Sequence, residues 1–127
     1  MKALFLTNEY PPYVYGGAGV HVEYLSRALA RRIEVEVRCF GDQEITAANP
    51  AVYGYAEWLE AKEHTDPRFA GVVDAFARSL AMAKDRLDAD VVHCHTWYTD
   101  MGGVLRANSG TCHTCSPSSF SRPAQPR

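Results

Sequence analysis

The feature that most constrains the fold is a glycine-rich segment, residues 9–21, between an apolar run and a helical pattern. The apolar residues 3–7 predict a buried strand, and the apolar periodicity from Val20 onward predicts a helix. Glycines between a strand and a helix let the backbone approach a ligand and direct the first N–H groups of the helix toward negative charge. The amides around Gly17–Val20 therefore predict a site for a phosphorylated ligand.

Composition is that of an ordinary globular domain. The 127 residues suffice for one modest core, and 46% of them are apolar. A net charge of −2 with mixed signs gives no reason to expect a nucleic-acid partner. No apolar run approaches the roughly 20 residues of a membrane span, and Asn8 and Glu9 end the apolar start too early for a signal peptide. We expect a cytoplasmic protein without a membrane partner, whose four cysteines are thiols.

Strand and helix patterns alternate along the chain, which predicts an α/β fold with a parallel sheet and right-handed crossovers. Strands are expected over 2–8, 34–40 and 90–95, and helices over 18–31, 66–87 and 100–108. Within 34–40, Val35 and Val37 alternate with charged residues, which favours an edge or half-covered strand.

Apolar periodicity also predicts which helix faces turn inward. The expected inward residues of the first helix are Val20, Tyr24, Leu25, Ala28 and Leu29. Those of the second helix are Phe69, Val72, Val73, Phe76, Leu80 and Ala83. Asp66 is expected to cap this second helix, with Pro67 in its first turn.

Residues 111–127 depart from the alternating pattern. They contain a single large apolar residue and several Ser and Pro, which predicts a disordered tail. A doubly wound domain would place its next parallel strand here, and residues 111–118 can be encoded so that a shifted frame reads Val-Pro-His-Val-Leu-Thr-Val. We therefore interpret 111–127 as a frameshift product and 1–110 as an incomplete Rossmann-like domain. The C-x-x-C pair Cys112 and Cys115 is then accidental, not a zinc or redox site.

A second cluster of polar and aromatic residues follows the strand expected at 90–95. His93 and His95 share one face of that strand, but without a further nearby ligand they do not predict a metal site. In open parallel sheets the ligand crevice lies at the carboxyl ends of the strands, so both segments are expected to open onto one edge. Aromatic rings beside carboxylates and imidazoles suit sugars. The residues expected to converge there are Glu9, Tyr10, Tyr13, Tyr15, His21, His95, Trp97, Tyr98 and Asp100.

These two segments resemble motifs of bacterial glycogen synthase-like glycosyltransferases, in a branch with glycogen synthases and maltose-1-phosphate synthases. The motifs are Glu9-Tyr-Pro-Pro-Tyr-Val-Tyr-Gly-Gly-Ala-Gly-Val-His21 and Val92-His-Cys-His-Thr-Trp-Tyr-Thr-Asp100. The resemblance covers about residues 1–110 and implies the N-terminal, acceptor-side half of a GT-B fold. It implies retaining transfer of glucose from ADP-glucose or UDP-glucose to an α-glucan or sugar-phosphate acceptor, without a metal or cofactor.

The resemblance also implies roles for individual positions. It places Tyr15 to Gly19 against the donor phosphates, and His95, Trp97 and Asp100 near the cleft. The expected substrate-binding residues are Glu9, Tyr15, Gly16, Gly17, Gly19, His21, His95, Trp97 and Asp100. No catalytic residue is expected, because the family's catalytic histidine and carboxylates fall outside the matching part, so the chain alone is expected to be inactive. Val14 stands where related synthases carry a lysine.

Two other functions remain compatible with the glycine-rich loop. The first is a non-catalytic module that binds a sugar phosphate. The second is a fragment of an NAD-dependent oxidoreductase, because Gly17 and Gly19, with Asp42 as a ribose ligand, partly match a dinucleotide fingerprint. The residues between the strand and Gly16 disfavour this second alternative, since that fingerprint begins directly at the strand end.

Overall fold

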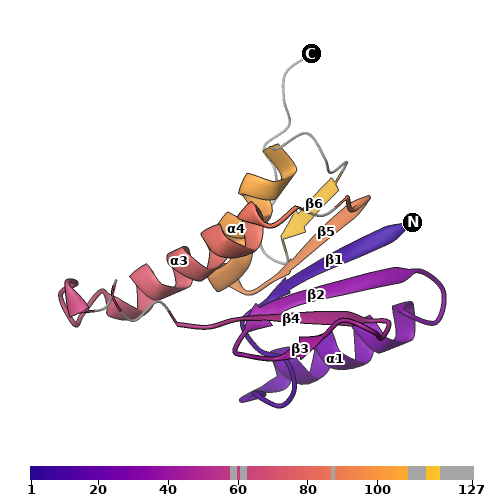
Figure 1. The fold of residues 1–127 in the computed structure, drawn as a ribbon, viewed down its shortest axis with the longest axis horizontal. Coiled ribbons are helices and arrows are strands. Elements are labelled where there is room, and N and C mark those ends of the chain that lie inside the picture. Colours follow the sequence, from indigo (N-terminus) through magenta and orange to yellow (C-terminus); the bar gives the residue numbers. More distant parts are fainter. Residues whose placement is uncertain (58–59, 61–62, 87, 109–113, 118–127) are drawn as a thin grey trace.

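The computed structural model describes residues 1–57, 60, 63–86, 88–108 and 114–117 (Figure 1). These residues form a mixed α/β structure around one sheet. The elements are β1 (Lys2–Thr7), α1 (Gly17–Leu29), β2 (Glu34–Phe40), β3 (Glu44–Ile45), β4 (Ala51–Tyr55), α3 (Ala70–Lys84), β5 (Val91–His95), α4 (Trp97–Asn108) and β6 (Thr114–Pro117).

The sheet has the strand order β3-β4-β2-β1-β5-β6, and every pairing is parallel except that of β3 with β4. Helix α1 lies on one side of this sheet, and α3 and α4 lie on the other (Figure 1). Successive side chains of β1 lie on opposite faces of the sheet. Phe5 packs in the cluster with Val22 of α1, whereas Leu4 and Leu6 pack with Met82 of α3. The predicted parallel α/β fold is therefore confirmed. No helix among the described residues is both long and apolar enough to span a bilayer.

Strand β2 corrects the expectation of an edge or half-covered strand. It lies between β4 and β1, and both Glu36 and Arg38 are buried. Arg38 donates from Nε to Glu36 Oε1 at 2.8 Å and from Nη1 to the carbonyl oxygens of Met82 and Asp85 at the end of α3. The alternation was misleading because these charges satisfy each other and the backbone of α3 inside the protein.

The inward faces of both long helices match the expected ones only in part. Leu25 and Leu29 of α1 pack against the core as expected. Val20 and Tyr24 of α1 are exposed. So are Val72, Phe76 and Leu80 of α3, and Phe69, which immediately precedes that helix. The buried positions are instead Gly19, Val22 and Ser26 of α1, and Asp74, Ala75, Ser79 and Met82 of α3. Small and polar residues mark these faces, because their side chains find hydrogen-bond partners: Ser26 bonds the Tyr10 hydroxyl at 2.9 Å, and Ser79 donates to the Tyr98 carbonyl at 2.6 Å.

The start of α3 lies later than predicted. Asp66 accepts hydrogen bonds from the backbone N–H and the guanidinium of Arg68, which lower the pKa of its carboxyl group. The helix itself begins at Ala70 without a side-chain cap. Asp66 therefore caps the turn that precedes α3. The helix ends at Lys84, three residues before the predicted end at residue 87.

Two short strands, β3 and β4, carry no strong sequence signal. Gly54 of β4 is required where it packs, because a Cβ there would lie 2.5 Å from the Gln43 backbone nitrogen and 2.8 Å from the Gly41 carbonyl oxygen. Asn49, just before β4, holds the connection between α1 and β2. Its Nδ2 donates to the carbonyls of Ala30 and Ile33, and its Oδ1 accepts the Val35 N–H.

The region 111–127 is described only at Thr114–Pro117. These four residues form β6, which pairs in parallel with β5 in the register Val92↔Cys115. A strand therefore replaces the expected irregular chain at this point, and it needs only the backbone groups of β5 to form. The predicted division at residue 110 and the rest of the predicted tail, including Cys112, lie outside the described residues.

Candidate functional site

The segments that follow β1 and β5 meet at one edge of the sheet. The two strands pair in parallel with Thr7 opposite His95, so their carboxyl ends coincide. Just beyond, Thr96 donates from Oγ1 to Asn8 Oδ1 at 2.9 Å, and Thr99 donates to the carbonyls of Leu6 and His95, both at 3.0 Å. Thr96 has a φ of 70°, a left-handed conformation that is unusual for a β-branched residue. The sequence-based expectation of a shared edge is confirmed.

The glycine-rich loop is held by a carboxylate of the chain itself. Glu9 Oε2 accepts the backbone N–H groups of Tyr15 and Gly16, each at 3.0 Å. Gly19 lies against this carboxylate: a Cβ at that position would lie 2.9 Å from both Cβ and Oε2 of Glu9. Gly16 and Gly17 are exposed, and a Cβ added at either position would meet no atom within 4 Å, so no packing demands glycine there. Two of the loop's donors are therefore already used internally.

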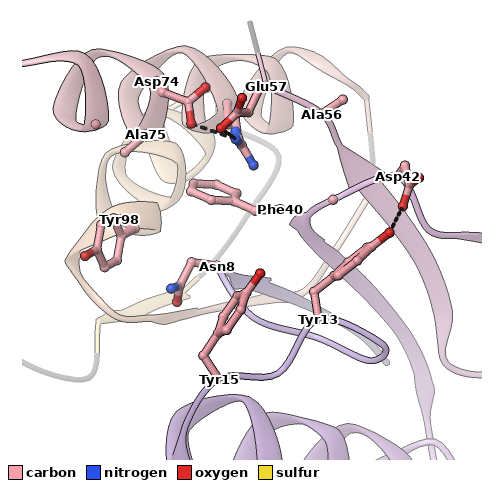
Figure 2. A pocket seen from close by; sticks show the side chains of 13 residues that line it. Asn8, Tyr13, Tyr15, Phe40, Asp42, Ala56, Glu57, Asp74, Ala75 and Tyr98 are labelled. Carbon is pink, nitrogen blue, oxygen red and sulfur yellow. Dashed lines mark hydrogen bonds and ion pairs between the residues drawn. The ribbon is translucent and has the colours of Figure 1, made fainter. Parts of the chain in front are cut away.

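A cavity of about 550 Å³ opens beside this loop (Figure 2). Its volume falls within the roughly 300–1,000 Å³ typical of small-molecule sites. It lies between the loop after β1, the turns after β2 and β4, residues 71–78 of α3 and the first turn of α4. The lining residues are Asn8, Tyr13, Tyr15, Phe40, Gly41, Asp42, Ala56, Glu57, Gly71, Asp74, Ala75, Arg78 and Tyr98.

Charged side chains are concentrated on the α3 wall of the cavity. Arg78 Nη2 lies 2.7 Å from Asp74 Oδ2 and 3.4 Å from Glu57 Oε1. Its guanidinium carbon stands 4.6 Å from the centre of the Phe40 ring, a cation–π arrangement. On the opposite wall the Tyr13 hydroxyl donates to Asp42 Oδ1 at 2.8 Å. These contacts fix the wall side chains without closing the space between them (Figure 2).

Three histidines form a separate cluster on the α1 side of the same edge. The His95 ring centre lies 4.3 Å from that of His93 and 5.6 Å from that of His21, and the Phe5 ring stacks on His95 at 5.9 Å. Burial, followed by the charges of His93 and His21, lowers the pKa of His95 to about 4. The Nε2 atom of His95 is buried and has no hydrogen-bond partner among the described residues. This side chain is therefore a neutral imidazole at pH 7.

The described residues bring only part of the expected set to the cavity. Of the nine expected substrate-binding residues, Tyr15 alone lines it. Trp97 stacks on Tyr98 at 4.1 Å and is half exposed. Burial raises the pKa of Asp100, whose Oδ1 has no partner within the described part of the chain. Substrate contact by Glu9, Gly16, Gly17, Gly19, His21, His95, Trp97 and Asp100 stays a prediction.

Sequence reasoning missed most of the α3 wall. Asp74 and Arg78 are an i, i+4 pair on the buried face of α3, but the apolar periodicity assigned the opposite face to the interior. Phe40 ends β2, and Glu57 follows the end of β4 by two residues. Their position at the carboxyl ends of parallel strands is the sequence feature that could have identified them as site residues. No group of three or more His, Cys, Asp or Glu side chains suited to a metal ion occurs in the described part of the chain.

Known proteins are similar in sequence to this chain over most of its length. Residues 15–127 match the family described as Glycosyltransferase Family 4. The alpha-maltose-1-phosphate synthase of Mycobacterium tuberculosis (strain H37Rv) is 40% identical over 110 residues, which cover 84% of this chain and 25% of that protein. The alpha-maltose-1-phosphate synthase of Mycolicibacterium smegmatis is 38% identical over 108 residues, 83% of this chain and 24% of that protein. The chain thus spans about a quarter of the length of these relatives. By the family match over residues 15–127, this chain belongs to glycosyltransferase family 4.

Proposed function

We propose that this chain forms the acceptor-side part of a retaining glucosyltransferase. The enzyme would transfer glucose from a nucleotide sugar, ADP-glucose or UDP-glucose, to an α-glucan or a sugar-phosphate acceptor. Relatives named alpha-maltose-1-phosphate synthase support transfer to a sugar phosphate. The nucleotide sugar enters as a substrate, and the proposal invokes no metal or further cofactor. A role in glycogen or related α-glucan synthesis in the cytoplasm belongs to the same proposal.

The observation that carries this proposal is the shared edge of β1 and β5 with a cavity beside it. Ligands of open parallel sheets bind at such edges, where neighbouring strands lead to helices on opposite faces. Here β1 leads to α1 on one face and β5 leads to α4 on the other (Figure 1). The cavity combines aromatic rings with carboxylates, an amide and a guanidinium, a mixture suited to sugar C–H faces and hydroxyl groups.

The same geometry supports our expectation that the chain alone does not catalyse transfer. A leaving nucleoside diphosphate needs positive charge or aligned donors in a cleft that excludes water. Among the described residues lining the cavity, Arg78 is the one basic side chain, and Asp74 and Glu57 already pair with it. The donor phosphates would therefore need groups that this cavity does not supply.

Two measurements on the purified chain test the proposal. Amide shifts in ¹H–¹⁵N spectra are followed during titration with maltose, glucose-1-phosphate and ADP-glucose, and we expect changes at Asn8, Gly41 and Thr96 along the edge. The same samples, incubated with ADP-glucose and each acceptor, are expected to yield no transfer product by mass spectrometry. Absence of any shift along the edge would contradict the proposed binding. Turnover that disappears in Gly17→Asp would contradict the expected inactivity.

A titration with NADH separates the oxidoreductase alternative. Nicotinamide fluorescence should not change on addition of the chain, because Gly16 lies well beyond the end of β1, whereas a dinucleotide fingerprint begins directly at the strand end. Saturable enhancement of this fluorescence would favour a dinucleotide site instead.

A further inference from the structure

Helix α3 carries its apolar residues on the side that faces water. The exposed fractions are 38% for Val72, 44% for Phe76 and 56% for Leu80, which lie on successive turns, and 57% for Phe69 just before the helix. These four residues share one side of the helix because they are spaced three or four positions apart. We call this surface the α3 stripe. A surface helix ordinarily turns apolar residues inward, so the α3 stripe indicates a helix that another surface covers.

Charged residues do not interrupt the α3 stripe. Within residues 70–83, all of them described, the charged side chains are Asp74 and Arg78, which are only 10% and 11% exposed and form an ion pair with each other. Helix α1 differs, because the charged side chain of Arg27 lies on its exposed side. None of the stripe residues is among those that line the cavity. The α3 stripe is therefore a separate surface from the candidate site.

The segments at the two ends of α3 carry opposite net charge. Before the helix, residues 63–68 hold two acids, Glu63 and Asp66, and one base, Arg68. At its end, residues 84–86 hold two bases and one acid. Two copies of α3 packed antiparallel would bring the acidic end of each beside the basic end of the other, whereas parallel packing would bring like charges together. Antiparallel packing also aligns the two helix dipoles favourably.

We propose that the α3 stripe is the interface of a homodimer, in which the α3 helices of two copies pack antiparallel about a two-fold axis at Phe76. Such an interface is self-complementary, so one stripe on each copy suffices to form it. Val72 of one copy faces Leu80 of the other, because each lies four residues from Phe76. The inference goes beyond the proposed function and does not depend on it, since the stripe lies outside the cavity.

The small size of the α3 stripe sets the strength of this association. Four side chains of these types, as far as they are exposed, would bury on the order of 400 Å² of apolar surface per copy, about half of what a standard interface buries. Part of the gain is offset by the loss of translational and rotational freedom. We therefore expect a reversible dimer with a dissociation constant on the order of 10–100 μM.

Sedimentation equilibrium of the purified chain tests the proposal. Samples span concentrations from well below to well above the expected dissociation constant. The average mass should rise from the 14.1 kDa of one chain and level off at about twice that value. A plateau at the dimer is expected because the two-fold arrangement uses up the stripe of both copies.

Matched variants locate the interface. Phe76→Glu should raise the dissociation constant roughly tenfold or more, because the two-fold axis would bring two carboxylates together in an apolar contact. Tyr24→Glu is the control, since Tyr24 is 70% exposed on α1, on the other side of the sheet (Figure 1), and it should leave the constant unchanged. Dispersed ¹H–¹⁵N spectra establish that each variant remains folded.

A pair of charged variants tests the antiparallel register. Val72→Glu and Leu80→Lys should each dimerise roughly tenfold or more weakly on their own, because each sets a charge against an apolar side chain. An equimolar mixture of the two should associate more tightly than either variant alone. In the mixed dimer the introduced carboxylate and ammonium face each other at one contact, and Val72 and Leu80 keep their native contact at the other.

The possible outcomes decide for or against the proposal. A chain that stays monomeric at the highest concentration overturns it and leaves the α3 stripe to a different protein surface. A mass that rises past the dimer without levelling off also overturns it, because it indicates non-specific association. A dimer that Phe76→Glu leaves intact, or that Tyr24→Glu weakens equally, places the interface elsewhere. A mixture of Val72→Glu and Leu80→Lys that gains no affinity contradicts the antiparallel register.

Discussion

Replacing Gly19 with alanine tests how the glycine-rich loop is held in place. A methyl group there would lie 2.9 Å from Cβ and Oε2 of Glu9 and 3.0 Å from Cγ1 of Val14. Contacts this short force the loop to move, and overpacking of this kind costs about 1–3 kcal/mol. The movement also weakens the hydrogen bonds from Tyr15 and Gly16 to Glu9, which are 3.0 Å long in the native loop.

Two further effects of the substitution on stability have opposite signs. Loss of these partly exposed hydrogen bonds adds about 1 kcal/mol, and the better helix propensity of alanine returns up to about 1 kcal/mol. We therefore expect Gly19→Ala to lower the free energy of unfolding by about 2 kcal/mol. For a domain of this size that corresponds to a fall in Tm of roughly 8 °C.

Gly17→Ala is the matched control. A methyl group there meets no atom within 4 Å, and the residue is exposed in the first turn of α1. Its unfolding free energy should stay within about 0.5 kcal/mol of the unmodified protein. Urea denaturation followed by circular dichroism measures both variants. A neutral Gly19→Ala, or equal losses in the two variants, would refute the role assigned to the contact with Glu9.

Buried ionisable groups lead to three more expectations. The pKa of His95 is about 4 in the folded chain against the usual 6.5, so as the pH falls the unfolded chain binds a proton at His95 before the folded chain does. The free energy of unfolding should therefore decline by about 2 kcal/mol, allowing for solvent screening, as the pH falls from 6.5 to about 4. In urea melts, His95→Asn should flatten that decline and His64→Asn, an exposed control, should not. Arg38→Met removes the 2.8 Å partner of the buried Glu36 carboxylate and leaves it only the longer ion pair with Lys2 at 3.8 Å, so thermal unfolding should show a loss of about 3 kcal/mol; an unchanged Tm would contradict the buried pair. Burial raises the pKa of the Cys39 thiol to about 12, so iodoacetamide at pH 8 should alkylate it much more slowly in the folded chain than in urea, and equal rates by mass spectrometry would refute this.

The sequence predicted the elements whose apolar pattern is simple. β1 and β5 are adjacent, largely buried strands inside the sheet, and their parallel order follows from the helices between them. The placement of β2 was wrong because Glu36 and Arg38 form an internal ion pair, and charge in a strand ordinarily indicates solvent. The inward faces of α1 and α3 were predicted only in part, for a related reason. Leu25 and Leu29 pack against the core as predicted, but Ser26 and Ser79 are buried through hydrogen bonds that only the folded chain creates.

The site was predictable in position and less so in composition. Parallel strand ends place Asn8, Tyr15 and Tyr98 near one edge without any knowledge of side-chain contacts. The place of Arg78 in the cavity was not predicted, because its setting depends on Glu57 and Phe40, which come from other parts of the chain. Such tertiary pairs leave no periodic signal in a single sequence.

A crystal structure of the chain with maltose bound tests the central claim most directly. We predict one glucose unit inside the cavity beside the shared carboxyl edge of β1 and β5, with its face toward Tyr15 or Tyr98. Maltose seated elsewhere on the chain, with this cavity empty, would contradict the account.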